Sequence, residues 1–252
     1  IKIMHELGPE IYWRVVMDPA RPRTQSTPAQ KFGTLVHTAI LEPDQLSSRY
    51  QKCGPRNTKS GKEEALYIES KGMIPVNYSD WELMEGMVKS VWSHPIAAEF
   101  LDNPLAIAEQ SHWRDDEKSG LCCKCRTDLM VGDTIVDLKT TTEGGSAPSR
   151  FAKTVGSFFY HIQAAHYLRM TEADRFVFLV VEKAWPFSVG LFELDDIQER
   201  LNQSRDALLP LKKQREKLEL KIDKAQKELV KLGNDLMSFR QGEVVLTSGQ
   251  DL

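Results

Sequence analysis

The chain has 252 residues, of which 41% are hydrophobic and 27% are charged. This length and apolar content are enough for one full hydrophobic core with an appendage, and they exclude a wholly disordered protein. The formal net charge of -3 excludes a surface covered with basic residues, but not a local basic groove beside acidic metal ligands.

The lack of a recognisable signal peptide or membrane helix and the cysteine usage both favour a cytoplasmic protein. No run approaches the roughly 20 apolar residues of a membrane helix, and the segment after Ile1 does not resemble a signal peptide. Because the chain does not start with Met, we expect the numbering to begin inside a longer chain or after a trimmed tag. The four cysteines fit a reducing compartment, in which thiols stay free.

The first part of the chain is predicted to contain little regular structure before one clear helix. Residues 1–31 carry four prolines around a short helical piece at 10–17, so we expect an irregular segment. A helix is predicted at 31–41, where apolar residues recur at helical spacing. It presents His37 one turn after Gly33.

A basic segment and a long helix follow. Residues 50–64 contain two glycines and a proline and are predicted to form a loop. A long helix is predicted at 79–100, interrupted at His94-Pro95. The basic residues of the loop are Arg56, Lys59 and Lys62.

From Ala106 onward the period of the apolar residues changes from helical to two, which is typical of strands. The order of one helix, three strands, a second helix and two strands predicts a mixed α/β fold in layers. The predicted strands are 106–113, 121–130, 134–139, 176–182 and 188–193, with a glycine-rich loop at 142–148 and a helix at 149–170.

The C-terminal tail differs in character from the rest. It is highly charged, and its apolar residues follow a heptad pattern, so we divide the chain into a domain at 1–194 and a helical extension at 195–252. This extension is interpreted either as a helix packed on the body or a neighbouring helix, or as an oligomerisation arm. The heptad positions are Leu208, Leu211, Arg215, Leu218, Ile222, Ala225, Leu229, Leu232, Leu236 and Phe239.

Two acidic residues and a lysine on neighbouring strands are the first candidates for chemistry. Asp137 and Lys139 are two residues apart and share one face of a strand, and a tight turn brings Asp128 of the preceding strand close to Asp137. Converging carboxylates repel, so a hard cation such as Mg²⁺ is a natural occupant, with the Leu138 carbonyl as a further oxygen ligand. Taken alone, the same pattern also fits an ordinary ion pair on a strand rim.

Four further features strengthen the metal-site interpretation. Ile135-Val136 before Asp137 is apolar, so the pair emerges from a buried strand. Glu109 lies on the first strand. Arg126 precedes Asp128 by two residues and either keeps it ordered through a carboxylate or contacts phosphate. Gln163 and Tyr167 lie one helical turn apart on one face of the second helix.

In this order and on these elements, the residues resemble the PD-(D/E)xK nuclease superfamily, and within it the RecB-like branch and the RecE (exonuclease VIII) type of phage recombination nuclease. The resemblance covers roughly residues 28–193. It implies a restriction-endonuclease-like core with a central mixed β-sheet flanked by helices. The motifs that carry it are Gly33-Thr34-Leu35-Val36-His37, Glu109, Arg126-Thr127-Asp128, Asp137-Leu138-Lys139-Thr140-Thr141 and Gln163-Ala164-Ala165-His166-Tyr167.

The resemblance also implies a role for each residue. Metal ligands would be His37, Asp128, Asp137 and the Leu138 carbonyl, and Lys139 would be the catalytic lysine. Glu109 would support a second metal or the attacking water, while Gln163 and Tyr167 would line the active site. For DNA phosphate we expect Arg56, Lys59, Lys62 and Arg126, since a basic, glycine-containing loop suits a terminal phosphate.

RecE-type enzymes degrade one strand of linear duplex DNA from its 5′ end and leave 3′ tails for an annealing partner. The resemblance therefore implies an Mg²⁺- or Mn²⁺-dependent exodeoxyribonuclease that forms an oligomeric ring, a trimer or a tetramer. Cys53, Cys122, Cys123 and Cys125 are wrongly spaced for the iron–sulfur cluster of some RecB-like nucleases, so we expect none. The rival hypotheses are an endonuclease or single-strand exonuclease of the same superfamily, and an inactive DNA-binding scaffold.

Overall fold

A computed structural model describes residues 2–22, 25–117, 120–193, 217–224, 226–228 and 230. The chain divides into two units, Ile1–Arg200 and Leu201–Leu252, and the first contains all the strands of the described residues. Within the described part, none of the helices has the length and apolar character that crossing a membrane requires.

The N-terminal segment is more helical than its prolines predict. It forms α1 (Lys2–Leu7), α2 (Pro9–Tyr12) and the π-helix η1 (Trp13–Met17). Helix α3 (Pro28–Leu41) starts three residues before the predicted helix, because a capping box joins Thr27 and Gln30 and places Pro28 in the first turn. The short helix α4 (Pro43–Arg49) follows directly.

The prediction of a loop at 50–64 is wrong. Strand β1 (Tyr50–Cys53) pairs in parallel with β2 (Ile74–Asn77), and helix α5 (Lys59–Ser70) connects them. Thr58 caps α5 through its side chain, and Glu64 of α5 accepts a hydrogen bond from the Gly54 backbone at 2.7 Å. Four-residue strands are too short to show a period, so the pairing that forms them is invisible in a local pattern.

The long predicted helix at 79–100 is two helices, α6 (Tyr78–Ser93) and α7 (Pro95–Leu101). The predicted interruption at His94-Pro95 is confirmed. His94 is extended and its side chain accepts a hydrogen bond from the Ala97 backbone, so it ends one helix and caps the next.

The main sheet has five strands in the order β3-β4-β5-β6-β7. All five predicted strands are present, with ends that differ from the prediction by at most two residues. The pairings are antiparallel except between β5 and β6, which are parallel. The strands are β3 (Ala106–Asp115), β4 (Cys122–Val131), β5 (Thr134–Thr141), β6 (Arg175–Glu182) and β7 (Val189–Glu193).

A parallel pair needs a crossover, which here consists of α8 (Pro148–Phe158) and α9 (Tyr160–Thr171). The single helix predicted at 149–170 is therefore broken. Phe159 adopts a left-handed backbone conformation with φ 59°, which ends α8 and starts α9.

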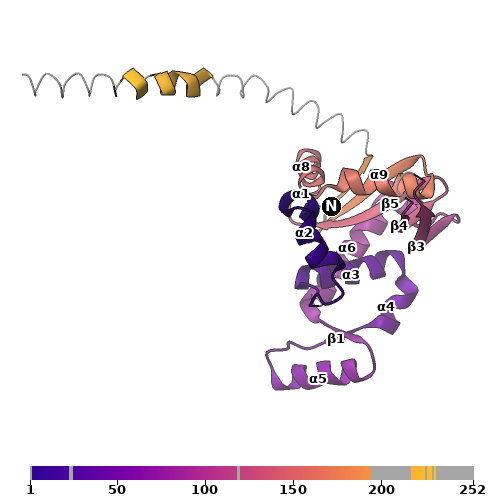
Figure 1. Ribbon diagram of the computed structural model, residues 1–252. Coiled ribbons are helices and arrows are strands. Elements are labelled where there is room, and N and C mark those ends of the chain that lie inside the picture. Colours follow the sequence, from indigo (N-terminus) through magenta and orange to yellow (C-terminus); the bar gives the residue numbers. More distant parts are fainter. Residues whose placement is uncertain are drawn as a thin grey trace, which may run out of the picture. The chain divides into compact units, whose positions relative to one another are not determined.

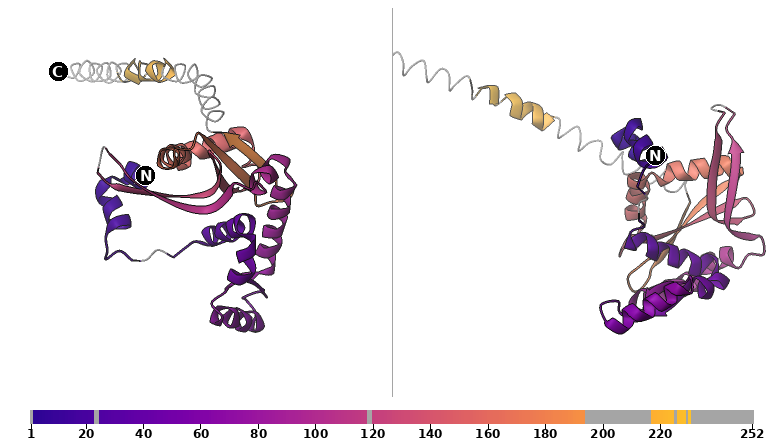
Figure 2. Two further views of the ribbon diagram at one scale, coloured as in Figure 1. Left: turned by 90° about the vertical axis from the view of Figure 1, so that its right-hand side faces the viewer. Right: turned by 60° about the horizontal axis from the view of Figure 1, so that its bottom comes forward.

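Helices cover both faces of the sheet, as Figures 1 and 2 show. Alternate residues of β5 and β6, such as Leu138 and Leu179, pack into one core with α3 and α6. On the other face Phe178 of β6 contacts Phe151 of α8 and Tyr160 of α9, with ring centroids 5.4 and 6.0 Å apart. This sandwich of helices and a mixed sheet confirms the predicted fold class.

The described part of the C-terminal extension is a helix with exposed side chains at 217–224. Two heptad positions fall there, and Leu218 and Ile222 are each 57% exposed. The predicted helix packing or oligomerisation role is untested. The other heptad positions, from Leu208 to Phe239, lie outside the described residues.

Candidate active site

The hairpin of β4 and β5 brings Asp128 next to the strand that carries Asp137 and Lys139. The ladder between the two strands has only three pairs, from Val131↔Thr134 to Leu129↔Val136. Asp128 is the next residue along, and its Oδ2 accepts a hydrogen bond of 2.8 Å from the Leu138 backbone N–H. The predicted approach of Asp128 to this strand is confirmed.

The sheet divides at this point. Beyond Asp128, β4 remains paired with β3, whereas β5 continues to Thr141 as the partner of β6. The strand pair β3–β4 consequently extends away from the rest of the sheet, as the right-hand view of Figure 2 shows. We call this division, at Asp128 and Asp137, the fork.

Asp137 is held by two partners on its own face of the sheet. It is 1% exposed, its Oδ2 lies 2.5 Å from Lys139 Nζ, and its Oδ1 accepts a 2.9 Å hydrogen bond from Gln163 Nε2. Gln163 also approaches Lys139, with 3.5 Å between Oε1 and Nζ. The predicted grouping of Asp137, Lys139 and Gln163 is thus present in the structure.

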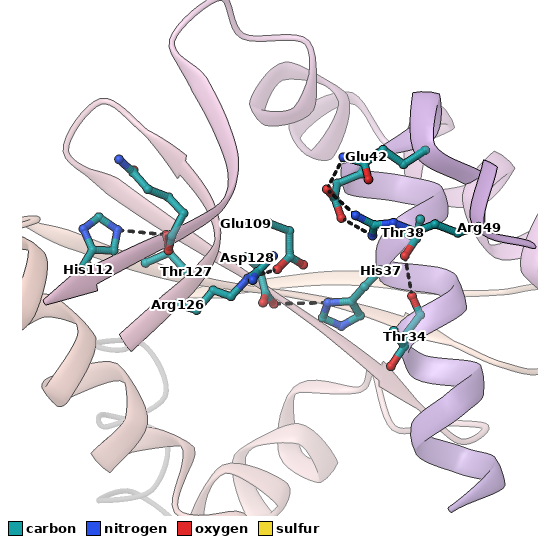
Figure 3. A network of polar contacts seen from close by, with 12 residues as sticks. Thr34, His37, Thr38, Glu42, Arg49, Glu109, His112, Arg126, Thr127 and Asp128 are labelled. Atoms are coloured by element: carbon teal, nitrogen blue, oxygen red, sulfur yellow. Dashed lines mark hydrogen bonds and ion pairs between the residues drawn. The ribbon is translucent and has the colours of Figure 1, made fainter. Parts of the chain in front are cut away.

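Asp128 also belongs to a second group, whose side chains could bind a metal ion. One ligand atom from each of His37, Glu109 and Asp128 lies within 4.8 Å of the others, and His37 Nδ1 is 3.7 Å from Asp128 Oδ2. Figure 3 shows His37 reaching down from α3 toward the two carboxylates of the strands. The three residues come from three different elements, so the folded sheet assembles them.

Glu109 adopts an unusual backbone conformation. It has φ 53° inside strand β3, and it lies opposite Asp128 at the one position where the β3–β4 ladder is interrupted. A left-handed conformation costs energy in a residue other than glycine, and such strain is typically found at functional sites. Arg126 Nε lies 2.6 Å from Glu109 Oε2 and stabilises this carboxylate, whereas a contact of Arg126 with phosphate stays a prediction.

The electrostatics of the site favour binding of a cation. Burial and the nearby charge of Asp137 raise the pKa of Asp128 to about 8. Burial, and then the charge of Lys139, lower the pKa of His37, which keeps its imidazole neutral and able to act as a metal ligand at neutral pH. A divalent cation would remove the repulsion that raises the pKa of Asp128.

Lys139 is a cation in this arrangement. Burial acts to lower its pKa, but the charges of Asp137 and Asp128 outweigh that effect and raise it. In the metal-free site Lys139 is therefore a cation beside Asp137.

The donor set fits a hard divalent cation. Carboxylate oxygens of Asp128 and Glu109 and one imidazole converge, and Mg²⁺ and Mn²⁺ take such oxygen-rich ligand sets. To join these ligands, Asp137 would have to release either Oδ2 from Lys139 or Oδ1 from Gln163. The Leu138 backbone is close enough to His37 to influence its pKa, so the predicted carbonyl ligand lies near this group.

The sequence motifs miss two residues of the site, Tyr160 and Glu182. The ring of Tyr160, the first residue of α9, lies 4.7 Å from Lys139 Nζ. Tyr160 precedes Gln163 by one helical turn, a spacing that could have revealed it. Tyr167, which the sequence did predict, lies near Gln163 and packs edge-on against Phe176.

Glu182 is the other missed residue. It lies at the end of β6, is 4% exposed, and accepts hydrogen bonds from the backbones of Gly144 and Ser146 at 2.9 Å each. Burial acts to raise its pKa, but the hydrogen bonds from Ser146 and Gly144 outweigh burial and lower it. Glu182 therefore anchors the glycine-rich loop that follows the strand of Lys139.

Three of the four basic residues predicted to bind phosphate, Arg56, Lys59 and Lys62, belong to the β1–α5–β2 arm, which Figure 1 shows at a distance from α9. Arg56 is occupied within this arm, since its Nη2 donates a 3.0 Å hydrogen bond to the Pro75 carbonyl and lies 3.9 Å from Glu69. Lys59 is 92% exposed, 4.0 Å from Glu63, and Lys62 is exposed. The structure thus separates these three residues from Asp137 and Lys139.

The four cysteines are free thiols and lie on two different sheets. Cys53 ends β1, while Cys122, Cys123 and Cys125 lie on β4. The expected absence of an iron–sulfur cluster stays a prediction.

Comparison with known proteins identifies the family. The model of the family described as "PDDEXK-like domain of unknown function (DUF3799)" matches residues 15–224, and the chain belongs to this family. The predicted superfamily is thereby confirmed, and the fold described above agrees with it. No match was found among the curated proteins that were compared.

Two solved structures are similar to this chain. The first, from Eubacterium rectale and provisionally described as an exonuclease, is 14% identical with a TM-score of 0.49, and the match covers 73% of this chain and 65% of that one. The second is the structure of SSO0001, which is 15% identical with a TM-score of 0.29, over 68% of this chain and 78% of that one.

Proposed function

We propose that this protein is a metal-dependent DNA nuclease. The observation that carries the proposal is the meeting of two groups at the fork. His37, Glu109 and Asp128 form a candidate cation site, and the buried Asp137–Lys139 pair lies directly beside it. A bound cation and a fixed positive charge can both stabilise the negative charge that develops during hydrolysis of a phosphodiester.

Each side chain has a distinct task in this proposal. His37, Glu109, Asp128 and Asp137 would hold the cation, which when bound lowers the pKa of water and polarises a phosphoryl oxygen. Lys139, kept charged by its acidic neighbours, stabilises the negative charge that grows on the phosphate. Gln163 contacts both Asp137 and Lys139 and so helps to position the pair before the cation binds.

We further propose an exonuclease that degrades one strand of linear duplex DNA from 5′ to 3′ with Mg²⁺ or Mn²⁺, works as a ring and supplies 3′ tails to an annealing protein. This finer assignment rests on the resemblance of the motifs to RecE-type enzymes. A same-superfamily endonuclease or single-strand exonuclease would use the same catalytic residues, so only substrate tests separate them.

The test uses linear, nicked and closed circular duplexes, with labels at either end and with or without a 5′ phosphate. We expect EDTA-sensitive loss of the 5′ label from linear duplex, and at least a 1000-fold loss of rate in Asp137→Ala and Lys139→Ala with DNA binding retained. The matched control is Asp174→Ala, an exposed aspartate before β6. Light scattering measures the number of subunits.

The outcomes separate the levels of the proposal. Wild-type rates in either catalytic variant would refute the nuclease assignment. Cleavage of closed circles would replace the exonuclease by an endonuclease, and preferential release of the 3′ label would reverse the polarity. A wild-type protein that binds DNA but stays inactive with Mg²⁺ and with Mn²⁺ would support the scaffold hypothesis.

A further inference from the structure

Tyr160 and Lys139 form a contact that the mechanism above does not use. The break between α8 and α9 at Phe159 places Tyr160 at the start of α9, and its ring faces Lys139 Nζ at 4.7 Å. On the side of the sheet, the ring stacks on Phe178, with centroids 6.0 Å apart and 28° between the planes. Phe178 is fully buried, so the sheet fixes the position of this ring.

Lys139 and the metal compete for the same carboxylate. One oxygen of Asp137 lies 2.5 Å from Lys139 Nζ, and the other accepts the hydrogen bond of Gln163. The candidate cation site in the described residues consists of His37, Glu109 and Asp128, without Asp137. A metal that recruits Asp137 must therefore displace the ammonium group from Oδ2, or draw Oδ1 from Gln163.

A displaced ammonium group needs another partner, because an unpaired charge in a buried site is costly. The face of an aromatic ring attracts a cation, and it has no carboxylate oxygen with which it could compete for the metal. Gln163 Oε1, at 3.5 Å, offers a neutral acceptor on the adjacent turn of the same helix.

We propose that Tyr160 is a positioning residue for Lys139, and that its ring holds the ammonium group while the metal takes the Asp137 carboxylate. This inference rests on the proposed nuclease function. The ring face is the working part, so the hydroxyl group of Tyr160 is dispensable. Without the ring, Lys139 stays on Asp137 and weakens metal binding.

The first experiment measures Mn²⁺ binding by calorimetry in the absence of DNA. Tyr160→Leu and Tyr160→Met remove the ring face, and the methionine variant keeps the apolar volume in case the leucine variant does not fold. We expect Mn²⁺ to bind about 5- to 20-fold more weakly in both, and within twofold of wild type in Tyr160→Phe. The matched control is Tyr67→Leu, which removes the Lys71–Tyr67 contact of 4.2 Å on α5.

A second measurement separates positioning from a merely structural effect. In a Lys139→Met background nothing competes for Asp137, so Tyr160→Leu should change the Mn²⁺ dissociation constant by less than twofold. On DNA, kcat of Tyr160→Leu should fall about 5- to 20-fold, with KM within twofold of wild type.

Three results would overturn the inference. They are an equal loss of Mn²⁺ affinity with and without Lys139, a loss in Tyr160→Phe as large as in Tyr160→Leu, and wild-type Mn²⁺ affinity in both ring-free variants. If wild type lacks nuclease activity but the Mn²⁺ coupling between Tyr160 and Lys139 is present, the proposed function fails and the positioning role stands.

Discussion

Replacing Asp128 by Asn should stabilise the protein in the absence of metal while abolishing its activity. The pKa of Asp128 is about 8 in the folded protein, against 3.8 for the free side chain, because burial and Asp137 disfavour its charged form. Since the folded-state pKa is the higher one, the folded state binds the proton more tightly. Asp128 therefore lowers the free energy of unfolding progressively from pH 4 to pH 8, and fully above pH 8.

The size of the effect follows from this shift. Each pKa unit corresponds to about 1.4 kcal/mol, so a shift of about four units sets a ceiling of about 6 kcal/mol. The Asp128 side chain is 17% exposed, and water reduces the penalty. Asparagine keeps an oxygen for the Leu138 N–H. We expect a gain of about 2–3 kcal/mol at pH 8, or roughly 5–10 °C in Tm.

Thermal unfolding in EDTA between pH 5 and pH 9 measures this gain, with Asp133→Asn in the turn of the same hairpin as the control. The difference between Asp128→Asn and wild type should grow up to pH 8 and then level off. Adding Mn²⁺ should raise the Tm of wild type but hardly that of the variant. A gain independent of pH, or no gain at pH 8, would refute the electrostatic reasoning.

Three further predictions concern other parts of the site and the arm. Glu182→Gln should lower the free energy of unfolding by about 1–3 kcal/mol, because Gly144 and Ser146 donate to different carboxylate oxygens and glutamine keeps only one. Since the pKa of Glu182 is lowered, this loss should shrink as pH falls below about 4, which denaturant titrations at pH 7 and pH 3 would test. Glu109→Gly should remove the φ 53° strain and raise Tm by a few degrees while cleavage is lost; a lower Tm would show that the carboxylate outweighs the strain. Lys59→Ala/Lys62→Ala should weaken binding of duplex ends about 3- to 10-fold and flatten its salt dependence with kcat unchanged, and equal binding at low salt would exclude a phosphate role for the arm.

The grouping of Asp128, Asp137 and Lys139 could be predicted because it depends on short-range geometry. A hairpin with a tight turn places Asp128 beside the strand of Asp137, and an alternating strand places Asp137 and Lys139 on one face. Helical spacing likewise predicts that Gln163 and Tyr167 share a face. Each of these relations is local, or spans one turn between adjacent strands.

The parts that could not be predicted depend on long-range pairing or on single backbone angles. Strands β1 and β2 are four residues long, and they form because they pair across α5. The left-handed backbone of Phe159 breaks a sequence with continuous helical character, and that break is what turns Tyr160 toward Lys139. The meeting of His37 with Glu109 requires the complete sheet, so the sequence supplied it only through resemblance.

The fork also bears on how the protein moves. Between β4 and β5 only three residue pairs join the two strands, and the Leu138 N–H depends on the Asp128 side chain for its partner. In hydrogen exchange, that amide should report local opening at the site instead of global unfolding. Its protection should rise when a cation joins Asp128 to His37, so the exchange of a single amide would report cation binding at the candidate site.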